Sequence, residues 1–266
     1  MSNLPQRFSL ESKNVLVTGA TGYLGRSMAL GMAELGANVI INGRNRQRVD
    51  AYVTELLNAG YKATPAVFDV NNGQAVWDWF KSYGYVPLHG LVNNAYTGGV
   101  GSVETASDDD YRNSFEISLV SAHRLLQGAL PSLRAAVNTC GSASVVNIGS
   151  MYGLVSPDQR IYENKQSSNP PFYGASKAAL LHWTRYAACE FGREAIRVNS
   201  ISPGPFPSQE VQEANPCLIT ALTKKVPMGR IGQSEEIQGP LSFLISDAAT
   251  FVNGTNLVVD GGWTCW

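Results

Sequence analysis

A tyrosine and a lysine four positions apart are the residues of this chain that are best spaced for chemistry. Tyr173 and Lys177 stand in the segment YGASK, and four positions along a helix bring two side chains to one face, about one turn apart. A free tyrosine has a pKa near 10 and is a poor base at neutral pH. A cation about 4 Å away is worth about 4 kcal/mol at a surface-like dielectric, or about three pKa units. Lys177 is therefore expected to lower the pKa of Tyr173 until its hydroxyl can exchange a proton with a substrate oxygen.

A serine at the end of a buried apolar run is the third candidate. Ser150 closes the segment VVNIGS, and its hydroxyl could hold the same substrate oxygen from the other side. A nicotinamide cofactor would carry the hydride, and in its oxidised form it would help Lys177 to lower the pKa of Tyr173.

Three glycines follow the first apolar run. In VLVTGATGYLG, Gly19, Gly22 and Gly25 are spaced three apart between an expected strand and an expected helix. Such a turn gathers backbone N–H groups and the positive end of the helix, where a pyrophosphate binds without a cationic side chain. Gly19 would permit the tight turn, Gly22 the approach of phosphate, and Gly25 the packing of helix on strand. A plain strand–helix turn is the alternative, but the position after the first strand favours a dinucleotide site.

The residues after the second apolar run indicate which dinucleotide is preferred. An acidic residue there would accept the ribose 2′-hydroxyl of NAD and repel the 2′-phosphate of NADP. The run instead ends in INGRN, which contains Arg44, and an arginine can pair with phosphate through its fork of donors. NADP is predicted over NAD, which remains an alternative, as does an exposed Arg44 that only begins a helix.

Short apolar runs alternate with helical patterns along the chain, which must position these residues. Strands are predicted over 15–17, 38–41, 66–68, 90–92, 145–148, 197–201 and 256–259, and helices over 23–35, 46–59, 74–83, 107–134 and 173–191, with a break near Pro131. This alternation predicts one α/β domain over 1–266, a doubly wound parallel sheet covered on both faces. The proline-rich stretch 203–216 is expected to be a loop over the site, and residues 1–12 a flexible segment.

Composition excludes several classes of function. The 266 residues have a net charge of −1, which gives no support for binding nucleic acid or an anionic membrane. No apolar run approaches the roughly 18 residues of a membrane span, and the scattered cysteines and histidines predict neither disulfides nor a metal site. A cytoplasmic globular protein is expected. The charged fraction of 15%, against about 25% as usual, favours an oligomer that hides part of the surface.

Several motifs together resemble the short-chain dehydrogenase/reductase family. The turn opens with the family's TG, NNA follows the fourth strand where the family has NNAG, PG follows the sixth strand, and VDGGW resembles the usual ending; with YGASK they span about residues 13–263. The resemblance implies a seven-stranded Rossmann fold with the cofactor at the carboxyl ends of the strands. It also implies NAD(P)-dependent hydride transfer between an alcohol and a ketone, and a homotetramer or homodimer formed through helices 107–134 and 173–191.

The resemblance also implies roles for single residues. Ser150, Tyr173 and Lys177 would be catalytic. Ser118 stands where the compact branch has a helix asparagine that holds a water linking the lysine to solvent; a serine could hold a water or merely fill space. The implied cofactor contacts are Gly19, Thr21, Gly22, Tyr23, Leu24, Arg44, Asp69, Val70, Asn94, Ala95, Tyr173, Lys177, Pro203, Gly204 and Phe206.

The sequence departs from the compact branch in three further places. Its turn reads TGxxGxxG, which is more typical of the extended branch, and Tyr96 replaces the glycine of NNAG. The gap from Ser150 to Tyr173 is 23 positions, about twice the usual length. The extra stretch includes Arg160 and Lys165 and is interpreted as a polar cap beside the catalytic tyrosine, suited to a polar or sugar-like substrate, with a solvated loop as the alternative. This combination is similar to bacterial sugar-pathway oxidoreductases.

Three other functions are alternatives that the sequence favours less. An extended-type sugar epimerase or dehydratase would need a substrate domain, for which little chain remains after Asp260. A non-catalytic dinucleotide sensor would lose the tyrosine or the lysine, and this chain keeps both. An enoyl reductase would space the two residues more widely.

Overall fold

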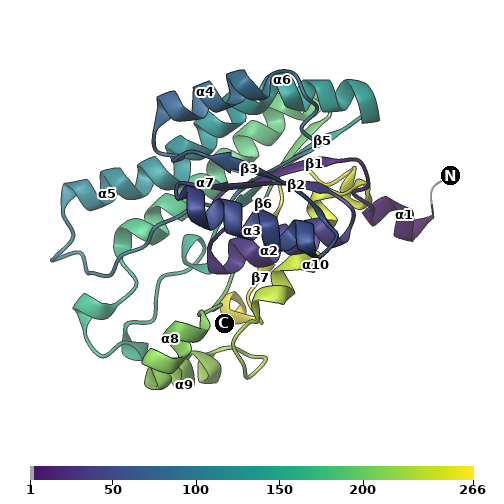
Figure 1. The fold of residues 1–266 in the computed structure, drawn as a ribbon. Coiled ribbons are helices and arrows are strands. Elements are labelled where there is room, and N and C mark those ends of the chain that lie inside the picture. Colours follow the sequence, from purple (N-terminus) through teal and green to yellow (C-terminus); the bar gives the residue numbers. More distant parts are fainter. Residues whose placement is uncertain (1–2) are drawn as a thin grey trace.

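Seven parallel strands form one sheet in the order β3-β2-β1-β4-β5-β6-β7 (Figure 1). The computed structural model describes residues 3–266. The predicted fold class is confirmed: β1 lies between β2 and β4, so the strand order reverses there and a crevice opens at the carboxyl ends. The strands are β1 (Asn14–Val17), β2 (Asn38–Gly43), β3 (Lys62–Val67), β4 (Gly90–Asn93), β5 (Ala143–Ile148), β6 (Ile196–Pro203) and β7 (Asn256–Val259).

Burial explains which strands were easy to predict. Every residue of β4, β5 and β6 is buried, because helices cover both faces of the central sheet. The edge strand β3 begins at Lys62, four residues before the predicted start at Ala66. Its first half alternates exposed and buried residues, so no continuous apolar run marks it.

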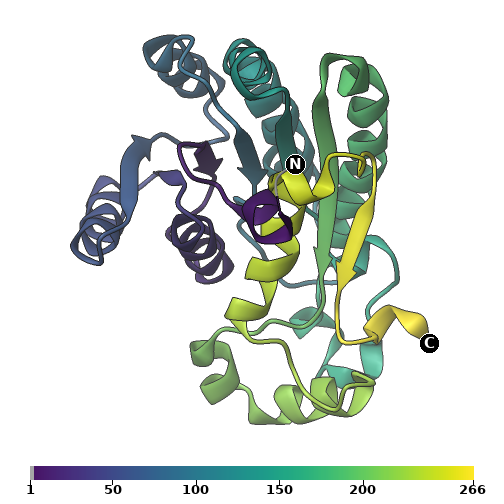
Figure 2. The same cartoon turned by 90° about the vertical axis from the view of Figure 1, so that its right-hand side faces the viewer.

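The helices form two layers, which Figure 2 shows on opposite faces of the sheet. One layer contains α2 (Tyr23–Glu34), α3 (Arg46–Asn58) and α10 (Gln238–Ile245), and its core includes Met28, Val49 and Leu241. The other layer contains α4 (Gly73–Tyr83), α6 (Ser121–Cys140) and α7 (Pro171–Phe191), and its core includes Phe80 and Leu125.

The long helix predicted over 107–134 is interrupted, but not at Pro131. It consists of α5 (Asp108–Phe115), a π-helical turn (Glu116–Val120) and α6, which continues through Pro131 to Cys140. The predicted break is wrong because the buried neighbours Ser132 and Leu133 keep that part of the helix packed against the sheet layer. The π turn lies instead where Ser118 is buried against α7.

Two other expectations need correction. The stretch 203–216 is a loop only at its start, because α8 (Gln209–Ala214) forms within it and α9 (Pro216–Lys225) follows; both lie below the sheet in Figure 1. The segment 1–12 is not wholly flexible, since α1 (Leu4–Phe8) is helical and Leu10 is fully buried in the core.

The described residues contain neither a membrane-spanning helix nor a cluster of metal-binding side chains. Within residues 3–266, no helix has the length and apolar character needed to cross a membrane. The same residues contain no group of three or more histidine, cysteine, aspartate or glutamate side chains arranged to hold a metal ion.

Gly25 provides a test of how α2 packs on the first turn. A Cβ on Gly25 would lie 2.2 Å from the carbonyl oxygen of Gly19, a backbone atom that cannot move aside. Gly25→Ala is expected to lower the free energy of unfolding by about 2 kcal/mol or more. Gly239→Ala in α10 is the control: nothing lies within 4 Å of a Cβ there, so the variant should gain up to about 1 kcal/mol in helix propensity. Equal urea midpoints for the two variants would contradict this account.

Candidate active site

The glycine turn presents free backbone N–H groups at the start of α2. Gly19 adopts a φ of +62°, which a glycine tolerates at no steric cost. Gly22 is the N-cap of α2 and makes no side-chain cap, so the first amides of the helix point into the crevice. The side chain of Asn94 donates to the carbonyl of Thr18 at 2.8 Å, and the Thr18 hydroxyl accepts from the backbone N–H of Asn94 and of Ala95. The end of β4 therefore holds the turn in place.

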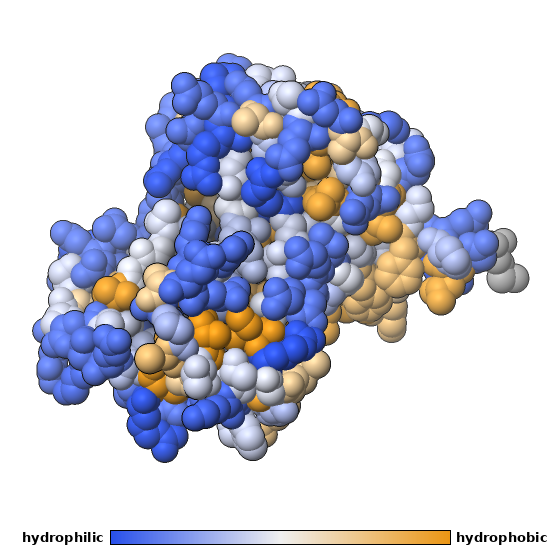
Figure 3. All heavy atoms as spheres, turned by 60° about the horizontal axis from the view of Figure 1, so that its bottom comes forward, coloured by the Kyte–Doolittle hydropathy of each residue, from blue (hydrophilic) through white to orange (hydrophobic). Residues whose placement is uncertain are grey.

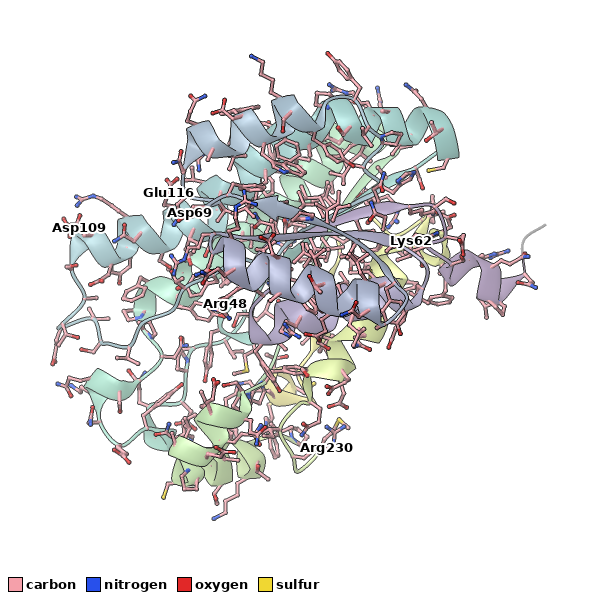
Figure 4. The ribbon with its side chains drawn as sticks, in the orientation of Figure 1. Arg48, Lys62, Asp69, Asp109, Glu116 and Arg230 are labelled. Atoms are coloured by element: carbon pink, nitrogen blue, oxygen red, sulfur yellow. The ribbon has the colours of Figure 1, made fainter. Side chains whose placement is uncertain are left out.

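A groove runs from this turn along the ends of β2 and β3. Phe68, which directly follows β3, lines this groove. Figure 4 shows Asp69 and Arg48 toward the same edge of the sheet. Seven of the predicted cofactor residues line this groove: Gly19, Thr21, Gly22, Arg44, Asp69, Val70 and Ala95.

The sequence analysis missed a second arginine in the groove. Arg48 is the third residue of α3, four positions after Arg44, and its guanidinium donates to the carbonyl of Thr21 at 2.9 Å. Arg48 was visible in the sequence run RNRQR, but spacing alone did not show that its side chain lines the groove with Arg44, which precedes the helix.

Other predicted cofactor residues lie beyond the groove lining. Tyr23 and Leu24 form the first turn of α2, and Pro203 ends β6. Gly204 packs so closely that a Cβ would lie 2.5 Å from the Cα of Asp260. The ring of Phe206 lies against Gly232 and lines a separate cavity with Met228, Arg230 and Asp260.

The three predicted catalytic side chains converge where β5 ends. Tyr173 lies in the first turn of α7 and Lys177 one turn later, and both are largely buried. The ammonium of Lys177 donates to the carbonyl of Ile148, the last residue of β5, at 2.8 Å. Ser150 follows two residues later, and its hydroxyl is close enough to Tyr173 to influence its pKa. The arrangement places two hydroxyls and one cation beside the crevice.

Burial dominates the electrostatics of this site. It raises the pKa of Tyr173, the Ser150 hydroxyl lowers it, and Tyr96 raises it. Burial also lowers the pKa of Lys177 from 10.5 to about 8. In the protein without cofactor, Lys177 does not lower the pKa of Tyr173, because the ammonium is directed at the Ile148 carbonyl and lies 5.7 Å from the centre of the tyrosine ring. The predicted lowering, which includes the charge of an oxidised nicotinamide, stays a prediction for the protein with bound cofactor.

Tyr96, which replaces the family's glycine, packs against both catalytic residues. Its ring meets that of Tyr173 edge-on, with centroids 4.9 Å apart, and its centroid lies 4.9 Å from the Lys177 nitrogen. The Tyr96 hydroxyl lies 3.3 Å from that of Ser114. The replacement was visible in the sequence, but its contacts were not.

Ser118 lies in a buried cluster of serine hydroxyls. Its oxygen is 3.2 Å from that of Ser176, which is 2.9 Å from that of Ser114. The cluster fastens the π turn and α5 to α7. The partner of Ser118 is thus a neighbouring serine, and a role for Ser118 in proton relay stays a prediction.

Two charged residues of the extra stretch, Arg160 and Lys165, form ion pairs away from the catalytic side chains. Arg160 is 88% exposed and pairs with Asp158 at 2.8 Å, while Lys165 pairs with Glu104 at 3.3 Å. The expected polar cap beside the catalytic tyrosine is therefore wrong for Arg160. Lys165 lines a cavity together with Tyr152 and Gly174, and its role toward a substrate stays a prediction.

The buried charge of Lys177 predicts a stability that changes with pH. A pKa lowered from 10.5 to about 8 corresponds to about 3 kcal/mol that opposes folding below pH 8. Between pH 8 and 10.5 the unfolded chain keeps a proton that the folded chain has lost, so stability rises with pH. Lys177→Met removes this penalty but leaves the Ile148 carbonyl without its donor.

We expect Lys177→Met to be more stable than wild type by about 2 kcal/mol at pH 7, since the lost hydrogen bond offsets part of the gain. The advantage should disappear as the pH approaches 10. Urea unfolding across this range measures it, with the exposed Lys81→Met as control. If the difference in the free energy of unfolding between Lys177→Met and wild type does not vary with pH, Lys177 does not carry a buried charge in the folded protein.

Comparison with known proteins agrees with this geometry. A family profile described as enoyl-(acyl carrier protein) reductase matches residues 19–264. Gluconate 5-dehydrogenase of Gluconobacter oxydans is 32% identical over 264 residues, which cover 98% of both chains.

Solved structures extend the comparison. A gluconate 5-dehydrogenase from Burkholderia cenocepacia in complex with NADP and tartrate matches with a TM-score of 0.88 at 28% identity, covering 99% of this chain and 100% of that one. L-Sorbose reductase from Gluconobacter frateurii, complexed with NADPH and L-sorbose, matches with a TM-score of 0.84 at 26% identity, covering 97% and 98%. With the tyrosine, lysine and serine assembled beside a glycine turn, these matches show that the chain belongs to the short-chain dehydrogenase/reductase family, NAD(P)-dependent oxidoreductases that act on CH–OH and C=O groups.

Proposed function

We propose that this protein is an NADP-dependent oxidoreductase that interconverts a polar, sugar-like alcohol and its ketone. The observation that carries the proposal is the convergence of Ser150, Tyr173 and Lys177 at the end of β5, beside a groove that begins at free helix amides. The bound nicotinamide cofactor would supply or accept the hydride.

Each catalytic side chain has a defined task in this proposal. Tyr173 passes a proton to or from the substrate oxygen. Because burial raises the pKa of Tyr173, its hydroxyl is protonated in the free protein and can donate a proton to the oxygen of a ketone that accepts a hydride. Ser150 donates to the same oxygen as charge develops on it. Lys177 keeps a positive charge at the base of the site.

Two arginines support NADP over NAD. Arg44 follows β2, Arg48 lies in the first turn of α3, and both line the groove. A 2′-phosphate on the adenosine ribose would meet two cations there, and the strand end offers no carboxylate to repel it. Relatives solved with NADP or NADPH agree with this assignment.

The choice of substrate class rests on the relatives and on motif spacing. Gluconate and L-sorbose are polyhydroxylated, and the matched proteins named for them cover nearly the whole chain. The spacing of four between Tyr173 and Lys177 argues against the enoyl reduction named in the family profile. Full-length matches to dehydrogenases favour an oxidoreductase over an epimerase, and both catalytic residues are kept, against a sensor.

We further propose that the whole chain, 1–266, works as one dinucleotide-binding domain in a cytoplasmic homodimer or homotetramer. The helices expected at the interface expose apolar side chains: Val120 in the π turn is 37% exposed and Tyr186 in α7 is 68% exposed.

Turnover by Tyr173→Phe tests the proposed reaction. Wild type is assayed with NADPH or NADP against ketoses, sugar acids, polyols and simple ketones at the nicotinamide absorbance band. The variant keeps the ring and loses the proton donor, so turnover should fall at least about 100-fold while the NADPH dissociation constant stays within about twofold. Equal turnover in the variant would exclude Tyr173 from the mechanism, and a wild type inactive on the whole panel would overturn the proposed function.

Cofactor choice is tested by dissociation constants for NADPH and NADH. Arg44→Ala and Arg48→Ala should each weaken NADPH binding about 10-fold or more, as expected for the loss of one charge-assisted contact to phosphate, and leave NADH binding unchanged. Arg46→Ala is the matched control, because Arg46 reaches toward Asp50 at 4.0 Å. Tighter binding of NADH than NADPH by wild type would reverse the assignment.

A further inference from the structure

Two tyrosine hydroxyls meet beside the candidate catalytic residues. Tyr152 lies in the short helical turn Met151–Gly153, two residues after Ser150, and Tyr162 comes from the extra stretch before α7. Their hydroxyl oxygens are 3.0 Å apart. Tyr152 is only 8% exposed, so its hydroxyl has little access to bulk water.

The ring of Tyr152 is fixed relative to the reacting groups. Its backbone N–H donates to the Ser150 hydroxyl at 3.1 Å, and Tyr173 packs on the apolar cluster that contains Tyr152. A Cβ on Gly174, the residue after Tyr173, would lie 2.7 Å from the Tyr152 carbonyl oxygen. The backbones of these three residues are therefore held close together, and Tyr152 and Gly174 line one cavity.

The extra stretch is anchored, which fixes Tyr162. Asp158 pairs with Lys225 of α9 at 2.9 Å, and their side chains are only 12% and 27% exposed; the Lys225 ammonium also lies 5.0 Å from the centre of the Trp263 ring. At the other end, the Ser168 hydroxyl donates to the carbonyl of Gly101 at 2.9 Å. Figure 3 shows apolar surface bordered by hydrophilic residues on the side of the molecule from which α8 and α9 project.

The hydroxyl pair has hydrogen-bonding capacity to spare. Two hydroxyls in contact use one proton between them, and the Asn169 backbone also bonds to the Tyr162 hydroxyl. A second proton and further lone pairs remain for another oxygen. Burial, followed by Tyr162 and Tyr173, raises the pKa of Tyr152, so its hydroxyl keeps its proton. A buried pair of this kind discriminates against a ligand that offers no oxygen, because the second hydroxyl proton is then left without an acceptor.

We propose that Tyr152, held by Tyr162, is a specificity-determining residue that binds a second oxygen of the substrate, next to the carbon that exchanges the hydride. This inference rests on the proposed oxidoreductase function and narrows its substrate to hydroxylated ketones and polyols. The charged residues of the extra stretch fasten it in place, and its tyrosine supplies the recognition.

The test compares a hydroxylated ketone, L-sorbose or the best ketose of the panel, with cyclohexanone, which lacks a second oxygen. Tyr152→Phe should lower kcat/KM for the ketose about 10- to 100-fold, chiefly through KM, and change that for cyclohexanone less than about twofold. Tyr162→Phe should act in the same direction with a smaller loss. Tyr83→Phe is the matched control, since the Tyr83 hydroxyl lies 3.5 Å from the Pro87 carbonyl, far from the crevice.

Each outcome decides the inference. Wild-type kcat/KM for the ketose in Tyr152→Phe overturns it, as does an equal loss on both ketones, which would indicate a structural role. A wild type that reduces only ketones without a second oxygen also overturns it, while leaving the proposed reaction intact. Inactivity of wild type on every alcohol and ketone removes the reaction on which the inference rests. Thermal midpoints and NADPH affinity, expected to match wild type, separate lost recognition from misfolding.

Discussion

Lys177 keeps a positive charge inside the fold by donating to the carbonyl of Ile148, and the rest of the site depends on where that carbonyl lies. It ends β5 at the carboxyl edge of the sheet, so α7 must approach this edge closely. Gly153 permits the approach, because a Cβ there would lie 3.0 Å from the backbone of Lys177. Burial works against the charge and lowers its pKa to about 8, so the fold gives up stability in order to hold the group that its chemistry needs.

The crevice has two ends of different character. At the end of β2, Arg44 and Arg48 are exposed and face a groove with backbone amides, which suits a hydrated, charged ligand that arrives from solvent. At the end of β5, Tyr96 packs edge-on against Tyr173, and Tyr173 packs on the apolar cluster that contains Tyr152. Water is largely displaced there, so each hydroxyl interacts more strongly with a partner than it would in solvent.

The sequence predicted the features that depend on nearby residues. Apolar runs located the central strands, and spacing identified the glycine turn and the Tyr173–Lys177 pair. It did not predict features that depend on distant partners: the π turn is held by Ser118 against Ser176, 58 positions away. Side-chain direction was equally inaccessible, since Arg160 was expected beside the catalytic tyrosine, whereas Asp158, two residues earlier, holds it in solvent. The raised pKa of Tyr173 in the protein without cofactor was not predicted, because burial cannot be read from spacing.

The π turn (Glu116–Val120) has one residue more than an α-helical turn would need to span the same length. Each residue of an α-helix rotates the chain by about 100°, so this extra residue sets the angle between the faces that α5 and α6 present. Deleting it would leave α6 on the sheet and rotate α5 about its own axis by that angle. Ser114 would then turn away from Ser176 and from the Phe172 carbonyl, to which it now donates at 3.1 Å. α5 and α6 are therefore two segments with separate orientations. The number of residues between them is sterically constrained, even at positions where the side chain can vary.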